Sequence, residues 1–163
     1  MKILRVYALL MSVSLLLGCA QDLVRDFDES RFNYGPCRGH VSLDIWSGQI
    51  AEGDVLGLFS IYFQFEDANG YVVIDNVEIK DEKGRTHFHV SHAQLETKQL
   101  PGSDVTYTAS LGSERKNYPF GNYRVSGSAT YHGGQEGALP LKLSLDGEIR
   151  TRVDKRNSFL SRF

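Results

Sequence analysis

The stretch Phe59–Lys80, FSIYFQFEDANGYVVIDNVEIK, decides the fold. Its first part alternates apolar and polar side chains, with the apolar ones at Phe59, Ile61, Phe63 and Phe65. A period of two residues indicates a half-buried β-strand. The Asn-Gly pair that follows is typical of a hairpin turn, because both residues tolerate a positive φ. The stretch therefore predicts two antiparallel strands joined by a short turn.

The same alternation extends in both directions from this hairpin. In its second strand the alternation slips between Ile74 and Val77, which predicts a β-bulge or a strand break near Asp75-Asn76. Helical periodicity and internal repeats are absent from the sequence. Further strands are predicted at Val41–Ile45, Phe88–Val90, Leu95, Val105–Leu111, Tyr123–Tyr131 and Leu139–Val153.

Asp146-Gly147 interrupts the last of these runs and has the composition of a hairpin turn. A two-residue hairpin would pair Leu145 with Glu148 and so mix apolar and charged groups on one face. A continuous strand keeps one face apolar from Leu139 to Val153. We therefore predict one long final strand.

The segment Gly121–Val125 places a tyrosine, Tyr123, at the start of a late strand. This arrangement resembles the tyrosine corner of immunoglobulin-like sandwiches, in which the hydroxyl binds backbone upstream. The fold class predicted is all-β, an antiparallel immunoglobulin-like β-sandwich of about seven or eight strands. An eight-stranded β-barrel is the alternative, but the Gly-x-Trp typical of lipocalins is absent, since Asp44-Ile45 precede Trp46.

The N-terminus has the layout of a secretory signal, with Lys2 and Arg5 ahead of an apolar run that is too short to span a bilayer. The run ends in Leu16-Leu17-Gly18-Cys19, which resembles the lipobox of bacterial lipoproteins. The resemblance implies cleavage after Gly18 and lipidation of Cys19. Two or three acyl chains hold a protein durably on a membrane. In such lipoproteins a residue other than Asp after the cysteine, here Ala20, favours the outer membrane, and we expect its periplasmic face.

The chain divides into four expected parts. Residues 1–18 form the signal peptide, 19–38 the lipidated cysteine and a tether, 39–153 the sandwich domain, and 154–163 a basic and aromatic tail. Residues 1–18 hold two of the 18 Lys and Arg residues and none of the 20 Asp and Glu residues, so the mature chain has a formal net charge of −4. This mild acidity argues against nucleic-acid binding, which requires a clustered basic surface.

Once Cys19 is lipidated, Cys37 has no partner for an intrachain disulfide. We expect it to be a small buried residue at a strand entrance. The alternative is an intermolecular disulfide or a reactive thiol, but Arg38 is the only neighbouring cation that could lower its pKa.

Three of the five histidines lie within six residues, at His87, His89 and His92. On a strand, His87 and His89 would project on one side while Phe88 and Val90 enter the core. Two or three imidazoles could then share one Zn or Cu ion. A solvated strand face explains the same pattern. We therefore expect no cofactor, with the metal site as the alternative.

The C-terminal segment is basic where the rest of the mature chain is acidic. Such a patch attracts partners or anionic head groups, and large apolar residues beside it indicate a binding surface, although a solvated tail gives the same composition. The candidate partner-binding residues are Arg150, Arg152, Lys155, Arg156, Phe159 and Phe163.

The sequence contains none of the common catalytic or phosphate-binding motifs. We therefore expect a non-enzymatic, lipid-anchored envelope lipoprotein that acts as a protein-interaction or assembly module. One alternative is periplasmic metal binding through the histidine cluster. Another is binding of a small ligand or glycan, for which the candidate platforms are Trp46, Tyr62, Tyr71 and Tyr131.

Overall fold

The computed structural model describes residues 23–45 and 54–154; for residues 23–28 and 152–154 only the backbone is described. No helix in these residues is long and apolar enough to cross a membrane. The strands, in chain order, are β1 (Leu23–Asp28), β2 (Ser30–Asn33), β3 (Cys37–Ile45), β4 (Asp54–Phe65), β5 (Tyr71–Asp81), β6 (Thr86–Gln94), β7 (Thr97–Gln99), β8 (Tyr107–Gly112), β9 (Lys116–Pro119), β10 (Asn122–His132), β11 (Leu141–Ser144) and β12 (Gly147–Asp154).

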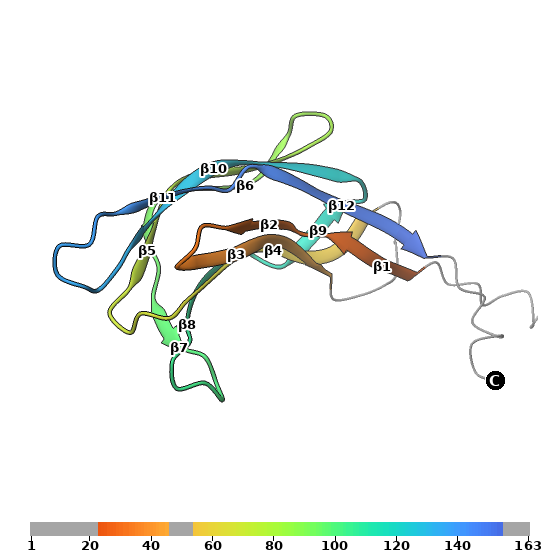
Figure 1. The fold of residues 1–163 in the computed structure, drawn as a ribbon. Helices are drawn as coiled ribbons and strands as arrows, with labels where there is room; N and C mark the ends of the chain where they lie inside the picture. The colour runs from red at the N-terminus through yellow and green to blue at the C-terminus, as the bar shows by residue number, and fades with distance from the viewer. Residues whose placement is uncertain (1–22, 46–53, 155–163) are drawn as a thin grey trace, which may run out of the picture.

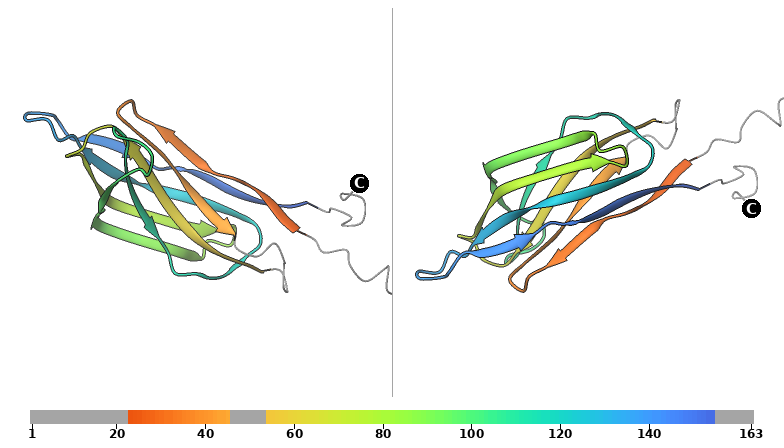
Figure 2. Two further views of the ribbon diagram at one scale, coloured as in Figure 1. Left: turned by 90° about the horizontal axis from the view of Figure 1, so that it is seen from below. Right: turned by 90° about the horizontal axis from the view of Figure 1, so that it is seen from above.

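The strands form two antiparallel sheets that pack face to face (Figure 1). One sheet has the order β1-β12-β10-β5-β6, and β11 also pairs with β10. The other has the order β2-β3-β4-β8-β7, and β9 also pairs with β4. Figure 2 shows the two layers from below and from above. Because β11 and β12 share one neighbour, and β8 and β9 share another, each pair acts as a single interrupted strand.

This strand order is that of an immunoglobulin-like sandwich. The order β3-β4-β8/β9-β7 corresponds to strands A-B-E-D, and β11/β12-β10-β5-β6 corresponds to G-F-C-C′. The predicted all-β sandwich is therefore confirmed. The barrel alternative is wrong, because the strands form two separate sheets rather than one closed sheet.

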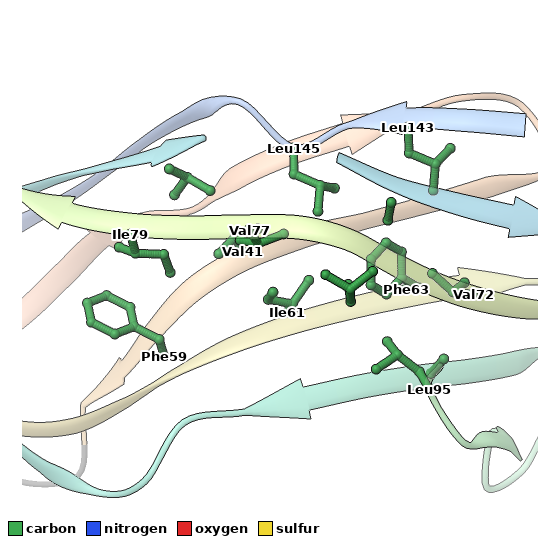
Figure 3. Packing of buried hydrophobic residues seen from close by; sticks show 14 of the residues in the cluster. Val41, Phe59, Ile61, Phe63, Val72, Val77, Ile79, Leu95, Leu143 and Leu145 are labelled. Atoms are coloured by element: carbon green, nitrogen blue, oxygen red, sulfur yellow. The ribbon is translucent and has the colours of Figure 1, made fainter. Parts of the chain in front are cut away.

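The core lies between the two sheets and follows the alternation of the sequence. Along β4 every second residue is buried, from Val55 to Phe65, as the period of two requires. Figure 3 shows side chains of the two sheets facing each other across the core, among them Phe59, Val77 and Leu143. Burying each of these large apolar groups stabilises the domain by about 1.5–3 kcal/mol.

Two irregular positions agree with the predictions. Ser128 of β10 pairs with Asn76 and the next residue, Ala129, pairs with Ile74, so Asp75 is the extra residue of a β-bulge. Asp146-Gly147 is not a hairpin, since the strands on either side of it both pair with β10 in the same direction.

The tyrosine corner is present at the start of β10. The Tyr123 hydroxyl donates a hydrogen bond to the backbone carbonyl of Pro119. The Tyr123 ring lies edge-on to Phe59, at 5.1 Å between ring centroids. Burial raises the pKa of Tyr123 well above its ordinary value, so its hydroxyl stays protonated and remains a donor at neutral pH.

The N-terminal segment differs from the prediction. Residues 19–38 were expected to be a tether, but Leu23–Asp28 pairs with β12 of one sheet and Ser30–Asn33 with β3 of the other. The tether prediction is therefore wrong from Leu23 onward. The segment has few apolar residues because it lies at sheet edges, where strands need little apolar surface.

The sandwich has two unlike ends. The distal end is formed by loops 34–36, 66–70, 100–106 and 133–140, and the registers bring these loops together. The proximal end holds loops 82–85 and 120–121, together with Leu23 and Asp154, the first and last described residues of the outer strands. Figure 1 shows the start of β1 and the end of β12 at the opposite end from the β10–β11 loop.

Candidate functional site

A pocket of about 700 Å³ lies at the distal end. Its walls come from three segments that are far apart in the sequence: the β2–β3 turn, the end of β4 with the following loop, and the β10–β11 loop. In the immunoglobulin-like order the last two are the B–C and F–G loops, which bind antigen in variable domains. Its volume lies within the range of about 300–1,000 Å³ typical of ligand pockets.

Asp67 fixes two of these loops to each other. One carboxylate oxygen accepts a hydrogen bond from the backbone N–H of Asn69 at 3.0 Å, and the other accepts one from the N–H of Gly134 at 2.6 Å. A Cβ atom on Gly134 would lie 2.3 Å from the Cβ of Asn69, so only glycine fits there. The B–C and F–G loops are therefore held together before any ligand binds.

The B–C turn forms where it was predicted, but for a different reason. Gly70 N–H donates to Asp67 C=O at 3.0 Å, while neither Asn69 nor Gly70 has a positive φ. Instead, Gly70 makes room for Tyr131, since a Cβ there would lie 2.8 Å from the tyrosine oxygen.

Tyr131 forms part of the pocket floor. It is 5% exposed, and its ring lies 5.2 Å from that of Phe65. Burial raises the pKa of Tyr131 to about 12, so the phenol is neutral at pH 7. It therefore offers the pocket a hydroxyl and a ring edge.

Several polar side chains of the pocket have no partner among the described residues. Arg38 and Gln64 are direct neighbours on β3 and β4, and Glu66 follows on the same side of the sheet. None of these three side chains makes a hydrogen bond or an ion pair within the part of the chain that the structure describes. Their charges and amide groups are available to a ligand.

Two large apolar side chains are exposed at the distal end. Leu139 is 89% exposed and Val105 is 64% exposed, and the described residues include no other exposed large hydrophobic side chain. Both were predicted to lie on buried strands, and that prediction is wrong. Each lies in a loop just before its strand begins, where the alternation no longer reports burial.

The two ends also differ in charge. The distal loops contain Glu66, Asp67, Asp104 and Glu136 and neither Lys nor Arg. The described proximal loops, 82–85 and 120–121, contain two basic residues and one acidic one, namely Lys83, Arg85 and Glu82. The described distal loops therefore carry a net negative charge, which attracts a cationic partner.

The histidine cluster does not share one side of β6. Ile79 pairs with Phe88 and the next residue, Lys80, pairs with Thr86, so His87 is the extra residue of a bulge. The bulge turns His87 toward the core, where its ring lies 5.6 Å from that of Tyr123. The prediction that His87 and His89 project together is therefore wrong.

Each histidine has its own surroundings. His87 Nε2 lies 3.0 Å from Asp81 and His89 Nε2 lies 3.1 Å from Asn76 Oδ1, while His92 has a φ of 51°. Phe88 and Val90 pack against the core as predicted. Within residues 23–45 and 54–154 no three His, Cys, Asp or Glu side chains are grouped as metal ligands would be.

Asp81 is the centre of a polar cluster at the proximal end. Its carboxylate contacts His87 at 3.0 Å and the Arg85 Nε at 2.7 Å, and its side chain is only 8% exposed. The hydrogen bond with His87, followed by those from the Arg85 backbone and side chain, holds the pKa of Asp81 far below its ordinary value. The cluster fixes the β5–β6 turn.

Cys37 lies where it was predicted, at the first position of β3 and with no exposed surface. Burial raises the pKa of its thiol to about 12. A neutral, buried thiol is a poor nucleophile, so the geometry favours packing over the reactive alternative.

The predicted partner-binding residues are only partly described. Arg150 and Arg152 belong to β12, and Arg150 forms an ion pair with Glu148 at 2.7 Å. The remaining candidates, Lys155, Arg156, Phe159 and Phe163, lie outside the described residues.

The predicted aromatic platforms do not meet in one place. The Tyr62 ring stacks on His40 at 5.3 Å and the Tyr71 ring on His132 at 4.6 Å. Tyr131 alone of the candidates lines the distal pocket, and Trp46 lies outside the described residues.

No protein-family model matches the chain, and no curated protein matches it. Among solved structures, the chain resembles the protein named ApaA from Bordetella pertussis (13% identity, TM-score 0.40, covering 78% of this chain and 96% of the other). It also resembles the C-terminal domain of wzt (15% identity, TM-score 0.37, 80% of each chain). A third match is the Northeast Structural Genomics Consortium target SoR45 (13% identity, TM-score 0.37, 77% of this chain and 91% of the other). All three scores are below 0.5, and the fold assignment rests on the strand order.

Proposed function

We propose that the protein is a non-enzymatic lipoprotein, anchored through Cys19 to the periplasmic face of the outer membrane, whose sandwich presents its distal loops to an envelope protein. The observation that carries this proposal is that the two termini of the described chain and the pocket lie at opposite ends of the sandwich. Leu23 and Asp154 lie at the proximal end, while the pocket and the exposed Leu139 lie at the distal end.

The short distance along the chain from Cys19 to Leu23 supports this orientation. These four residue steps span at most about 14 Å when fully extended. A lipid on Cys19 is therefore held close to the proximal end. The distal loops then face away from the bilayer, where a partner can reach them.

The charge distribution favours the same orientation. The basic residues of the C-terminal segment follow Asp154, and anionic head groups attract cations near the surface by about 1 kcal/mol each. The acidic distal loops are repelled by the same surface. We propose that Arg152, Lys155 and Arg156 contact the membrane rather than the protein partner.

Site-specific photo-crosslinking in intact cells tests the proposal. A photoreactive amino acid replaces Leu139 at the distal end or, as a matched control, Glu82 at the proximal end. We expect one discrete protein adduct from position 139 and none from position 82. Replacing the lipobox by an ordinary signal-peptidase site should abolish the adduct, because the soluble protein is no longer concentrated at the membrane.

Two results would contradict the proposal. One is the same adduct from both positions, which would mean that the distal loops are not the contact surface. The other is an unmodified Cys19 in the intact mass of the purified protein, which would remove the anchor on which the orientation depends.

Binding of a small ligand is a second candidate function, and the pocket itself favours it. A cavity of about 700 Å³ with mixed polar and apolar lining suits a small polar molecule as well as a peptide. Displacement of a protein partner by a low-molecular-weight periplasmic extract, with the active fraction resistant to protease, would favour this candidate over the first.

A further inference from the structure

We infer that the distal pocket binds an extended protein segment that carries a basic side chain beside an apolar one. This inference rests on the proposed function and names the chemistry of the partner. Three features of the pocket support it: its charge, its unpaired hydrogen-bonding groups and its exposed apolar edge.

The charge of the pocket calls for a cation. Among its lining residues Arg38 is the only Lys or Arg, against the two carboxylates of Glu66 and Asp67. Asp67 already accepts two backbone N–H groups, whereas Glu66 is exposed and has no partner in the described chain. Asp104 and Glu136 are two further carboxylates of the distal loops. A Lys or Arg side chain directed at Glu66 satisfies this complementarity.

The unpaired groups beside Glu66 suit a peptide backbone. Arg38 donates only, while Gln64 and Gln135 both donate and accept. An extended segment presents unpaired C=O and N–H groups that must find partners when they leave water. The Arg38 guanidinium can donate a hydrogen bond to a backbone carbonyl of the segment, so it does not require an anion. The side-chain amides of Gln64 and Gln135 can bind either a backbone C=O or a backbone N–H.

The apolar edge supplies the remaining contact. Leu139 and Leu141 enter the pocket wall from the β10–β11 side and Pro36 from the β2–β3 turn. An apolar side chain next to the basic one would cover Leu139, which is otherwise 89% exposed. Burying apolar surface contributes about 25 cal/mol per Å², so this contact adds affinity that a purely cationic ligand would lack.

Direct binding to the mature lipidated chain in detergent tests the inference. The probes are fluorescent hexapeptides, acetylated and amidated at their ends: Gly-Leu-Lys-Leu-Lys-Gly, the Glu version Gly-Leu-Glu-Leu-Glu-Gly, and the Ser version Gly-Ser-Lys-Ser-Lys-Gly. Fluorescence anisotropy gives each dissociation constant. We expect the Leu-Lys peptide to bind at least tenfold more tightly than either of the others.

Two charge reversals locate the binding. Glu66→Lys should weaken binding of the Leu-Lys peptide at least tenfold, and Glu82→Lys, a proximal control with the same charge change, should leave it unchanged. Both positions are exposed, and thermal unfolding confirms that the variants fold. No binding of the Leu-Lys peptide up to millimolar concentration, or equal weakening by both variants, would overturn the inference.

Failure of this inference can be distinguished from failure of the proposed function. A crosslink at position 139 without peptide binding would leave a distal protein partner but reject its cationic, apolar chemistry. Peptide binding without a crosslink would support the pocket chemistry and reject the anchored interaction module.

Discussion

The proximal and distal ends of the sandwich are built from the same strands and differ in how their polar groups are used. At the proximal end Tyr123, Asp81 and His87 all find partners within the fold. At the distal end Arg38, Gln64 and Glu66 have none in the described chain. The exposed large apolar side chains of the described residues, Leu139 and Val105, both lie at the distal end.

This difference separates stability from recognition. Groups with partners inside the fold contribute to stability, whereas unpaired groups contribute nothing until a ligand arrives. We therefore expect substitutions at the proximal end to lower the free energy of unfolding. Substitutions of unpaired distal residues should change binding and leave stability nearly constant.

The largest expected effect is on Phe59, which lies fully buried between Tyr118 and Tyr123. Phe59→Ala should lower the free energy of unfolding by about 3–5 kcal/mol, because it removes apolar contacts and leaves a cavity. Leu139→Ala should change it by less than about 0.5 kcal/mol. Urea unfolding followed by tyrosine fluorescence measures both. A similar loss of unfolding free energy in the two variants would contradict the proposed difference between buried positions and exposed distal positions.

A smaller loss is expected at the tyrosine corner. Tyr123→Phe removes the donor to the Pro119 carbonyl, and the unpaired buried acceptor should cost about 1–3 kcal/mol. Tyr62→Phe is the matched control, because its hydroxyl has no hydrogen bond within the described chain. The same urea experiment applies, and an unchanged midpoint for Tyr123→Phe would show that the corner is not stabilising.

The Asp81 cluster predicts a dependence on pH. The pKa of Asp81 is lowered by folding, so its contribution to stability is complete above the ordinary aspartate pKa of about 4 and is lost as the pH falls below it. Asp81→Asn should therefore reduce the fall in Tm between about pH 5 and about pH 3. Asp104→Asn, at an exposed distal loop, should follow the wild-type curve. Parallel curves for Asp81→Asn and wild type would contradict the assignment.

The smallest effect on stability is expected where the distal loops are joined. Asp67→Ala leaves two loop N–H groups without their acceptor, but these groups lie near solvent, so the loss should be about 0.5–1.5 kcal/mol. The clearer signal is local: amide exchange at Asn69 and Gly134 should accelerate, while that of core residues in β10 stays slow. Uniform acceleration throughout the domain would mean that the link supports the whole fold.

Much of the fold could be predicted from the sequence, because the period of two is a direct consequence of burial on one side of a strand. It indicated the strands of the core, the irregularity at Asp75 and the absence of a hairpin at Asp146-Gly147. The tyrosine corner also followed from a local pattern, since its hydrogen bond spans four residues. Cys37 was predicted to be buried from its place at a strand entrance, and it is.

Four features escaped prediction for physical reasons. The segments that form the edge strands β1 and β2 are rich in polar residues, so their composition resembles that of a tether. The bulge at His87 reverses the direction of one side chain, and no apolar slip marks it in the sequence. The pocket joins loops up to about a hundred residues apart, and the exposure of Leu139 and Val105 depends on where the chain leaves the sheet. Glu136 and Asp104, placed beside them in turn-rich loops, were the signal that could have identified this end.

The distance of each end from the bilayer tests the central claim most directly. The 12 residues of β4 run from one end to the other, which at about 3.3 Å per residue is a separation of about 40 Å. Leu139→Cys and Glu82→Cys give single labelling sites, since Cys37 is buried, and energy transfer from a donor on each to an acceptor lipid can be measured on liposomes that carry the lipidated protein. We predict efficient transfer from position 82 and little from position 139. Equal transfer from both positions, or stronger transfer from 139, would contradict an anchored sandwich that presents its distal loops away from the membrane.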